Sequence, residues 1–326
     1  LKIMARRENL GLSMLADIAR LKRSPDVYAL GFVLGPRLNA AGRVGHADMA
    51  LELLTTRDKG RANQLAQELE LLNRQRQAIE LRVVDAAAVQ AEASLGKERR
   101  GSVIVVANEG WHPGVAGLAA ARLKERYQLP SFVLASNART GLASGSGRSI
   151  TGVDIGAAIR AAFEAGIIVK GGGHAMAAGL TVEISKLADF RSFMEEKLAG
   201  AVSGAAENVL PIDGALSASG ATLELIELLE QAGPYGAAHP SPMFAFPAHR
   251  VIYADPAGSD HIRCTLASAD GARIKAIAFR AMGTEMGELL LTERKLPLHI
   301  AGRLSIDEWG AKRVPSIQIE DAARIL

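Results

Sequence analysis

The chain has 326 residues, of which 48% are hydrophobic, 22% are charged and 4% are aromatic. This composition excludes collagen-like, coiled-coil and disordered proteins. It also excludes a membrane span, because no stretch approaches the ~18 uninterrupted apolar residues that a spanning helix needs. The length suggests two or three domains at roughly 100–200 residues each. The single cysteine, Cys264, has no partner for an internal disulfide, which favours a reducing cytoplasm.

A secretory signal has a basic segment followed by an apolar segment, and the sequence shows no such pattern. The chain opens directly on a helical pattern at Leu1, so we expect it to be a fragment of a longer protein.

The charge is unevenly distributed along the chain. The whole sequence carries 38 Lys and Arg against 35 Asp and Glu, a net charge of +3. From Pro211 onward 11 basic residues face 14 acidic ones (net −3), which leaves 27 against 21 (net +6) in the preceding part. Basic groups favour polyanions such as nucleic acids. The excess is small, so nucleic-acid binding and an ordinary solvated surface both stay open.

The N-terminal part is predicted to be helical. Apolar residues at helical spacing predict a helix over residues 1–24, and an apolar stretch over 28–37 runs into a Gly-Pro break. A long helix is predicted from about Lys59, and from Leu65 a 3-4 spacing of apolar residues continues without Gly or Pro until Gly96. A helix of some thirty residues spans about 45 Å. We expect it to bridge two lobes, and an ordinary core helix is the alternative.

The next hundred residues alternate strands and helices. Strands are predicted at 102–107 and 131–135, and helices at 116–127, 153–165 and 187–198. This alternation favours an α/β domain with a mostly parallel sheet. The small polar residues from Gly200 to Asn208 are a candidate linker.

From Leu210 the pattern changes to short strands. Strands are predicted at 243–254, 261–267, 273–279, 296–304 and 314–319, with helices at 221–231 and near 281–291. Five strands separated by turns predict a small β-barrel, for which an OB-fold is the expected type.

Two glycine-rich segments carry the candidate chemistry. Residues 171–179 set four glycines around His174, and glycines let a backbone approach an anion and turn its N–H groups toward it. The alternative is a tight turn at the entry to a helix, with an incidental histidine. Residues 144–149, Ser-Gly-Ser-Gly-Arg-Ser, are predicted to form a loop whose hydroxyls and Arg148 suit a terminal phosphate.

Two further segments are candidate anion sites. Residues 111–114 precede the helix predicted from Ala116, where free N–H groups of a helix N-terminus favour anions. Residues 35–43 hold two arginines and an asparagine, for which composition alone slightly favours a solvated loop. The seven histidines include no pair at metal-ligand spacing, and CxxC, HExxH and P-loop motifs are absent from the sequence. These residues indicate a phosphate or nucleic-acid binder without a catalytic metal centre.

Several segments in collinear order resemble the RecJ single-stranded-DNA exonucleases of the DHH phosphoesterase superfamily. They are GPRLNAAGR at 35–43, GHADMALELL at 45–54, LNRQRQ at 72–77, GWHPGVAG at 110–117, SGRS at 146–149 and GGGHAMAAGL at 171–180. The last three are similar to a DHHA1 domain, and residues 234–242 resemble the turn before the first strand of the RecJ OB domain.

The resemblance implies a fold and a division into parts. The fold is an α/β DHHA1-type domain plus a C-terminal OB-like β-barrel, joined to the tail of a DHH lobe by a long helix. The expected parts are the DHH tail at 1–59, the connecting helix at 60–97, the DHHA1 domain at 98–205 and the OB-fold domain at 206–326.

The resemblance also implies a function. RecJ proteins degrade single-stranded DNA from the 5′ end with Mn²⁺ or Mg²⁺ held by an N-terminal DHH domain. We therefore expect a metal-dependent exodeoxyribonuclease of DNA repair and recombination. This chain would carry the DNA and 5′-phosphate site without metal ligands, and alone it would be inactive. The residues carried over are Arg37, Asn39, Arg43, Ser146, Arg148, Gly172, Gly173 and His174, with His174 as an assisting group.

The expected partners are single-stranded DNA and a single-strand-binding or other repair protein, with no membrane. Two alternatives stay open: a non-catalytic module that holds strand ends or a partner, and an oligoribonuclease, which shares DHHA1 but lacks the OB region. The family pattern Phe-Gly-x-Gly-Asn-Pro-Glu-Pro is replaced by Tyr-Gly-Ala-Ala-His-Pro-Ser-Pro at 235–242. The barrel region is also net acidic, which counts against a strongly DNA-binding barrel.

Overall fold

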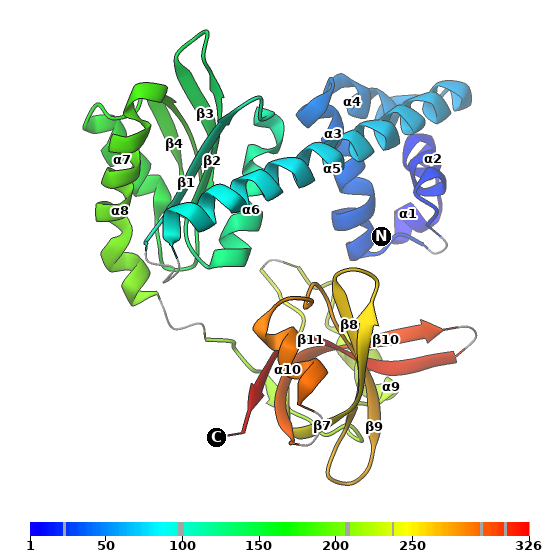
Figure 1. The fold of residues 1–326 in the computed structure, drawn as a ribbon. Coiled ribbons are helices and arrows are strands. Elements are labelled where there is room, and N and C mark those ends of the chain that lie inside the picture. Colours follow the sequence, from blue (N-terminus) through cyan, green and yellow to red (C-terminus); the bar gives the residue numbers. More distant parts are fainter. Residues whose placement is uncertain are drawn as a thin grey trace. The chain divides into compact units, whose positions relative to one another are not determined.

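The computed structural model describes residues 1–21, 24–96, 101–205, 209–236, 238–293, 296–309 and 312–325. The chain divides into two compact units, Leu1–Asn208 and Val209–Leu326, each with its own hydrophobic core (Figure 1). None of the described helices is both long and apolar enough to cross a membrane. The predicted boundaries at 97, 98 and 206 lie outside the described residues, so the four-part division stays a prediction.

The first unit begins with short helices that pack on the start of a long one. They are α1 (Lys2–Ala5), α2 (Leu10–Ile18), the π-helical η1 (Ala29–Leu34), α3 (Gly35–Val44) and α4 (Asp48–Thr55). The prediction of one helix over 1–24 is wrong. Arg7 adopts a positive φ of 56°, and Asn9 caps α2 by accepting a hydrogen bond from the Leu12 N–H.

The Gly-Pro pair does not break the chain's helical course, which is a second correction. Helix α3 begins at Gly35 directly after η1. Pro36 lies in the first turn of α3, where a missing N–H leaves no hydrogen bond unmade. The segment 35–43, for which composition favoured a loop, is therefore helical.

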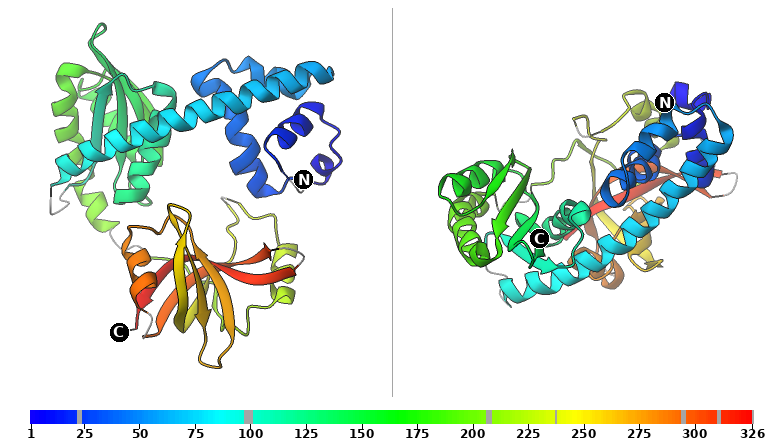
Figure 2. Two further views of the ribbon diagram at one scale, coloured as in Figure 1. Left: turned by 45° about the vertical axis from the view of Figure 1, so that its right-hand side comes forward. Right: turned by 90° about the horizontal axis from the view of Figure 1, so that it is seen from above.

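Helix α5 (Lys59–Leu95) connects two cores within the first unit. The Asp58 side chain caps its start, and it ends at Gly96 with a φ of 67°. Leu65 and Leu69 pack with the N-terminal helices, whereas Val83 belongs to the core beneath the sheet. The helix has 37 residues, so it is about 55 Å long. The predicted bridging helix is confirmed, and Figure 2 shows it in cyan.

The α/β part of the first unit contains a mixed five-stranded sheet. Its elements are β1 (Ile104–Glu109), α6 (Pro113–Tyr127), β2 (Ser131–Asn137), β3 (Leu142–Arg148), α7 (Ile155–Glu164), β4 (Lys170–His174), β5 (Ala177–Glu183), η2 (Ile184–Lys186) and α8 (Leu187–Gly204). The strand order is β1-β2-β3-β5-β4, and only β1 and β2 pair in parallel. The predicted mostly parallel sheet is wrong, because the segments taken for loops form β3 and β4. The predicted linker also fails over 200–204, which α8 includes.

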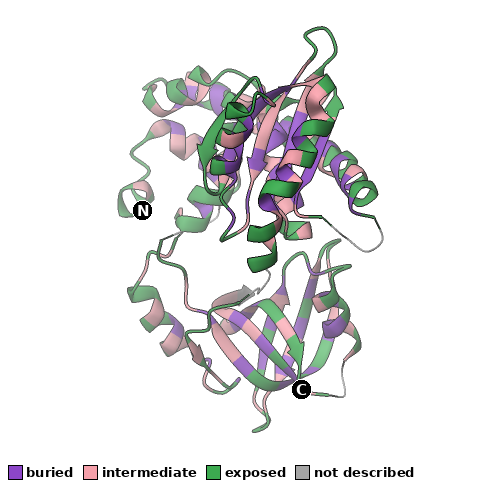
Figure 3. Ribbon diagram, turned by 90° about the vertical axis from the view of Figure 1, so that its left-hand side faces the viewer, coloured by how far each residue is buried: buried purple, intermediate pink, exposed green. Residues whose placement is uncertain are grey.

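The two faces of this sheet are covered by different helices. Helices α5 and α6 pack on the face that carries Val106 and Val133, whereas α7 and α8 cover the face with Phe132 and Leu180. Figure 3 shows buried residues along the strands and on the helix sides that meet them.

The second unit is a closed barrel. It contains β6 (Gly214–Ala215), α9 (Leu223–Gln231), β7 (Phe244–Ala257), β8 (His261–Ala267), β9 (Arg273–Ala278), α10 (Glu285–Thr292), β10 (Leu298–Trp309) and β11 (Lys312–Arg324). The order β10-β11-β9-β8-β7 is closed by pairing of β10 with β7. Phe246, Leu266 and Ile317 are fully buried inside. The predicted five-stranded barrel is confirmed, and β6 is a short addition to it.

Candidate nucleic-acid interface

Strand β3 places Ser146 and Arg148 on one face of the sheet. Side chains alternate along a strand, so Gly145 and Gly147 point to the opposite face. There a Cβ on Gly147 would lie 2.3 Å from the Phe132 ring, and one on Gly145 would lie 2.0 Å from the Val133 carbonyl oxygen. The Ser-Gly-Ser-Gly-Arg segment is therefore a strand whose glycines allow close packing, and the predicted loop is wrong.

The Gly-Gly-Gly-His segment forms β4, the edge strand of the sheet. A two-residue turn at 175–176 joins it to β5, and the Ala175 carbonyl accepts a hydrogen bond from the Ile155 N–H at the start of α7. All five residues of β4 are exposed. The segment is thus neither a helix-entry turn nor a loop that cradles an anion, which corrects both interpretations.

The three consecutive glycines of β4 have different surroundings. A Cβ on Gly171 would lie 2.7 Å from Ile159, and one on Gly173 would lie 2.3 Å from the Ala177 carbonyl oxygen. A Cβ on Gly172 would meet nothing within 4 Å. Gly172 therefore faces open space, whereas Gly171 and Gly173 face the packed side of the hairpin.

The strand register brings four of the predicted site residues onto one face. Ser146 pairs with Gly179, which pairs with Gly172, and Arg148 pairs with Ala177, which pairs with His174. Directly paired residues point to the same face of a sheet. We call Gly172 and Gly179, which are both exposed, the glycine floor. Polar residues of β3 border it on one side, and His174 lies two residues beyond Gly172 along the edge strand β4.

Arg148 extends from β3 onto helix α6. A Cβ on Gly117 would lie 2.7 Å from its Nη2, so the guanidinium occupies the space that this glycine leaves. Its hydrogen bond goes to the neighbouring Gly147 carbonyl at 2.8 Å. Burial lowers the pKa of Arg148, and the positive charge of Arg43 lowers it further. Gly117 was not among the predicted site residues, although it lies in the matching segment 110–117 and leaves the space that the Arg148 guanidinium occupies.

Arg43 reaches the same place from the end of α3. Its Nη1 donates to the Gly114 carbonyl at 3.1 Å, and α3 approaches α6 so closely that a Cβ on Gly114 would lie 2.1 Å from the Arg43 carbonyl oxygen. Within the described part of the chain, neither Arg43 nor Arg148 forms an ion pair with a carboxylate. Two half-buried guanidinium groups therefore repel each other there without a counter-charge. An anion such as a phosphate relieves that repulsion.

Arg37 and Asn39 have other surroundings on α3. Arg37 Nε lies 2.6 Å from Glu70 on α5, and its Nη1 donates to the Val33 carbonyl at 2.7 Å. Its side chain is 16% exposed, so the pair with Glu70 fastens α3 to α5. Asn39 is exposed. Among the described residues, no hydrogen bond or ion pair links Arg37 or Asn39 to Arg43 or Arg148.

The N-terminus of α6 does not offer the free N–H groups that we predicted. His112 caps the helix, and its Nδ1 accepts a hydrogen bond from the Gly114 N–H at 3.1 Å. The Val115 N–H donates to the His112 carbonyl, and Pro113 at the first position has no N–H. These donors are already used within the chain. The groups suited to an anion near this end of α6 are therefore the guanidinium groups of Arg43 from α3 and Arg148 from β3.

The described ranges contain no group of three or more His, Cys, Asp or Glu side chains that could hold a metal ion. The face described above is built from guanidinium, hydroxyl and imidazole groups, which suit an anion. Cys264 is buried in the barrel, and burial raises the pKa of its thiol to about 12. A thiol with so high a pKa is a poor nucleophile at neutral pH.

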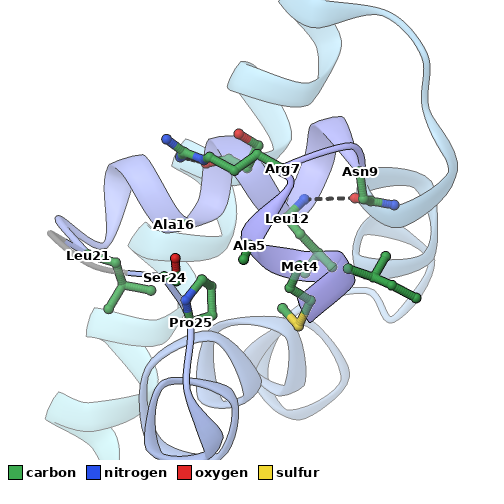
Figure 4. Close-up of a pocket in the computed structure, with 11 residues that line it drawn as sticks. Met4, Ala5, Arg7, Asn9, Leu12, Ala16, Leu21, Ser24 and Pro25 are labelled. Carbon is green, nitrogen blue, oxygen red and sulfur yellow. Dashed lines mark hydrogen bonds between the residues drawn. The ribbon is translucent and has the colours of Figure 1, made fainter. Parts of the chain in front are cut away.

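Two other hollows are less suited to a strand end. A pocket of about 320 Å³ among the N-terminal helices has mostly apolar walls, including Met4 and Leu12 (Figure 4). Its one arginine, Arg7, is paired with Asp17. A groove of about 690 Å³ on the barrel is lined in part by Tyr253, Phe279, Arg263 and Lys275. Both of its cations lie beside carboxylates, Arg263 beside Asp255 and Lys275 beside Asp307.

Comparison with known proteins agrees with the motifs. The model of the DHHA1 domain matches residues 100–200, and that of the RecJ OB domain matches residues 212–321. The single-stranded-DNA-specific exonuclease RecJ of Bacillus subtilis is 32% identical over 304 residues, which are 90% of this chain and 36% of that protein. RecJ of Salmonella typhimurium is 33% identical over 319 residues, covering 95% of this chain and 54% of that protein.

Solved structures give the same result. RecJ of Thermus thermophilus in complex with Mn²⁺ matches 98% of this chain and 44% of its own length, with a TM-score of 0.78 and 26% identity. The structure with Mg²⁺ gives a TM-score of 0.79 at 25% identity. The chain thus spans about half, or less, of the length of these relatives. It carries a DHHA1 domain and a RecJ OB domain, and over about nine-tenths of its length it is homologous to the RecJ exonucleases.

Proposed function

We propose that this chain holds the 5′ end of single-stranded DNA for a 5′-to-3′ exonuclease of DNA repair and recombination. The observation that carries the proposal is the pair of guanidinium groups at the junction of β3, α3 and α6. Arg43 and Arg148 converge there from segments more than a hundred residues apart, and neither is neutralised by a carboxylate of the described residues. A terminal phosphate, with its charge and several acceptor oxygens, fits such a pair.

The glycine floor gives the proposed strand room beside this pair. Gly172 and Gly179 carry no side chain above the sheet, so a sugar-phosphate backbone can approach the β4–β5 hairpin closely. In this proposal the Ser146 hydroxyl donates to a phosphate oxygen, and the exposed His174, two residues from Gly172 along β4, is the assisting group. We assign Gly173 to the packing of the β4–β5 hairpin and Arg37 to holding α3 against α5. Asn39, which is exposed on α3, is proposed to contact the DNA at a distance from the arginine pair.

These groups would act by positioning. Holding the terminal nucleotide in one orientation before the reaction lowers the entropic part of the activation barrier. RecJ of Thermus thermophilus has been solved in complex with Mn²⁺ and with Mg²⁺, and we propose either ion for the complete enzyme. The described residues of this chain do not fit such an ion, since they contain no cluster of suitable ligands. This chain alone is therefore proposed to bind DNA without hydrolysing it.

The second unit offers a further contact for the strand. Tyr253 and Phe279 on the barrel groove are 42% and 49% exposed, and exposed aromatic rings stack on bases without regard to sequence. The groove's cations are already paired, so stacking is the main contribution expected there. A cytoplasmic location and a single-strand-binding or other repair protein as partner belong to the same proposal.

The test is fluorescence anisotropy of the whole chain with a single-stranded oligonucleotide that carries either a 5′-phosphate or a 5′-hydroxyl. We expect tighter binding of the phosphorylated end. Arg148→Ala should reduce that preference by roughly tenfold, the contribution of one charge-assisted hydrogen bond. Arg139→Ala is the matched control, because it removes the same charge from the exposed turn that follows β2.

Other outcomes contradict the proposal in different ways. If Arg148→Ala lowers the affinity for both oligonucleotides equally, Arg148 contacts the internal backbone and end recognition lies elsewhere. Tighter binding of an RNA of the same sequence would favour the oligoribonuclease alternative. Absence of binding to either oligonucleotide would show that this chain does not hold the strand end by itself.

A further inference from the structure

A buried arginine lies in the middle of α5, where both α3 and α6 pack against this helix. Arg76 is 9% exposed, and its Nη2 donates to Asn73 Oδ1 at 2.9 Å. Its Nη1 donates to a carboxylate oxygen of Glu80, one turn further along α5. The other oxygen of Glu80 lies 3.7 Å from Arg122 Nε on α6. The network therefore joins α5 to α6 through a single carboxylate.

Helix stability alone does not explain this network. Burying a charged group costs free energy, and an apolar side chain of similar volume often replaces a buried ion pair without loss. Burial lowers the pKa of Arg76, Glu80 opposes that effect, and the charges of Arg43 and Arg122 lower the pKa further. Arg76 is thus desolvated and faces two like charges, of which Arg43 belongs to the proposed strand-end site.

The packing of α3 explains how Arg76 comes near Arg43. A Cβ on Gly45, just after α3, would lie 2.9 Å from the Leu72 side chain of α5. Arg76 follows Leu72 by one helical turn. Arg43 lies two residues before Gly45, and its guanidinium is directed toward Gly114 of α6. The cation on α5 and the cation on α3 therefore occupy the same three-helix junction.

We propose that Arg76 is a positioning residue for the strand-end site. Held by Asn73 and Glu80, its fixed positive charge repels the Arg43 guanidinium from α5 and keeps it directed toward Gly114 and Arg148. The ion pair with Glu80 keeps the Arg76 side chain away from the bound DNA strand. This inference rests on the proposed function, because it assumes that Arg43 and Arg148 bind the 5′-phosphate.

The test compares Arg76→Met with Arg82→Met in the whole chain. Both changes remove one positive charge from α5, but the Arg82 side chain is exposed and donates to the Ala78 carbonyl of its own helix. Each variant is measured for affinity toward 5′-phosphorylated and 5′-hydroxyl oligonucleotides over a range of salt concentrations. Thermal unfolding checks that each variant is folded.

We expect Arg76→Met to reduce the preference for the 5′-phosphate by several-fold, up to the roughly tenfold effect of one charge-assisted hydrogen bond. Arg82→Met should leave this preference unchanged. The slope of log affinity against log salt should be the same in both variants, because a positioning residue releases no counterion. Arg76→Lys keeps the charge but lacks the planar fork, so its preference should lie between those of wild type and Arg76→Met.

Three results would overturn the inference. If folded Arg76→Met keeps the wild-type preference, the network is structural only. If the slope of log affinity against log salt is shallower by about 0.7 in Arg76→Met than in Arg82→Met, Arg76 contacts a phosphate directly. If Arg76→Met does not fold, Asn73→Ala takes its place, since it removes one of the two groups that hold the Arg76 side chain while the charges of Arg76 and Glu80 remain. An unchanged preference in that variant also rejects the inference. A failure of the proposed function is distinguished by wild type itself showing no 5′-phosphate preference.

Discussion

Neighbouring glycines of β4 serve opposite purposes. Gly173 is required by packing, since any side chain there would collide with the backbone of β5. Gly172 has open space above it, and its φ does not lie in the left-handed region. Nothing in the fold therefore requires glycine at 172. Its lack of a side chain is explained by the ligand that the glycine floor is proposed to admit.

Substitution by alanine separates these two purposes. Gly172→Ala should leave the unfolding temperature unchanged and weaken oligonucleotide binding, because the methyl group stands on the floor. Gly173→Ala should destabilise the first unit by about 1–3 kcal/mol, the usual cost of overpacking. Thermal unfolding and anisotropy on both variants check this. Equal binding by wild type and Gly172→Ala would show that the strand does not cross this floor.

At the residue scale, the sequence was informative about chemistry but not about direction. The sequence indicated Ser146, Arg148 and His174 as candidate phosphate-binding residues from separate segments, and the strand register places them on one face of the sheet. Which glycine of β4 faces open space was not predictable, because the face on which a residue lies depends on strand register and not on composition. The pairing of Arg37 with Glu70 was equally hidden, since it joins residues 33 positions apart.

The turn between β8 and β9 illustrates how a single carboxylate stabilises an element. Asp270 accepts hydrogen bonds from the Ser219 hydroxyl at 2.6 Å, from the Ser268 hydroxyl and from the Ala272 N–H at 3.1 Å. These bonds lower its pKa from 3.8 to about 2, with the Ser219 bond contributing most. Through Ser219 the turn is attached to the segment that precedes α9.

The lowered pKa of Asp270 predicts a pH dependence of the barrel. A carboxyl group whose pKa is lower in the folded state stabilises the fold above its unfolded pKa near 4, and this stabilisation is lost as the pH falls toward 2. Asp270→Asn should therefore reduce the loss of stability between pH 4 and pH 2. Asp260→Asn, in the turn before β8, is the control. Denaturant unfolding of both variants across this range measures the effect, and identical pH profiles would refute it.

At the element scale, strong periodicity was predictable and glycine-rich strands were not. The apolar spacing of α5 continues from Leu65 without a breaker, β1 begins with a run of β-branched residues, and β8 alternates buried and more exposed residues, so these elements were predicted closely. Strands β3 and β4 lack apolar alternation because their neighbours pack against backbone instead of side chains. Their Ser-Gly and Gly-Gly-Gly patterns are also typical of loops, and only sheet pairing distinguishes the two.

At the scale of the whole molecule, charge predicts how binding depends on salt. The first unit carries the net charge of +6 and both arginines of the proposed site, whereas the residues from Pro211 onward carry −3. Two or three phosphate contacts give a slope of log affinity against log salt of about −1.4 to −2.1, or roughly a tenfold loss of affinity between 50 and 200 mM salt. Because arginines and not carboxylates form the site, EDTA should leave the affinity unchanged.

Anisotropy titrations at several salt concentrations, with and without EDTA, provide the measurement. A slope near zero would show that the binding surface is not the arginine pair. A loss of affinity in EDTA would reveal a metal ion bound by side chains of this chain, against the arrangement of its described His, Cys, Asp and Glu residues.

The length of helix α5 fixes the distance and the rotation between the N-terminal helices and the sheet, so insertions and deletions in it have large effects. Each residue of an α-helix advances the axis by about 1.5 Å and rotates it by about 100°. One residue added between Leu69 and Val83 would therefore turn the N-terminal helices by more than a quarter revolution relative to the sheet, carrying Arg43 away from Gly114. A surface turn such as 138–141 tolerates the same insertion with little effect. The number of residues in α5, more than their identity along its exposed face, is thus the quantity that sequence change in this protein must preserve.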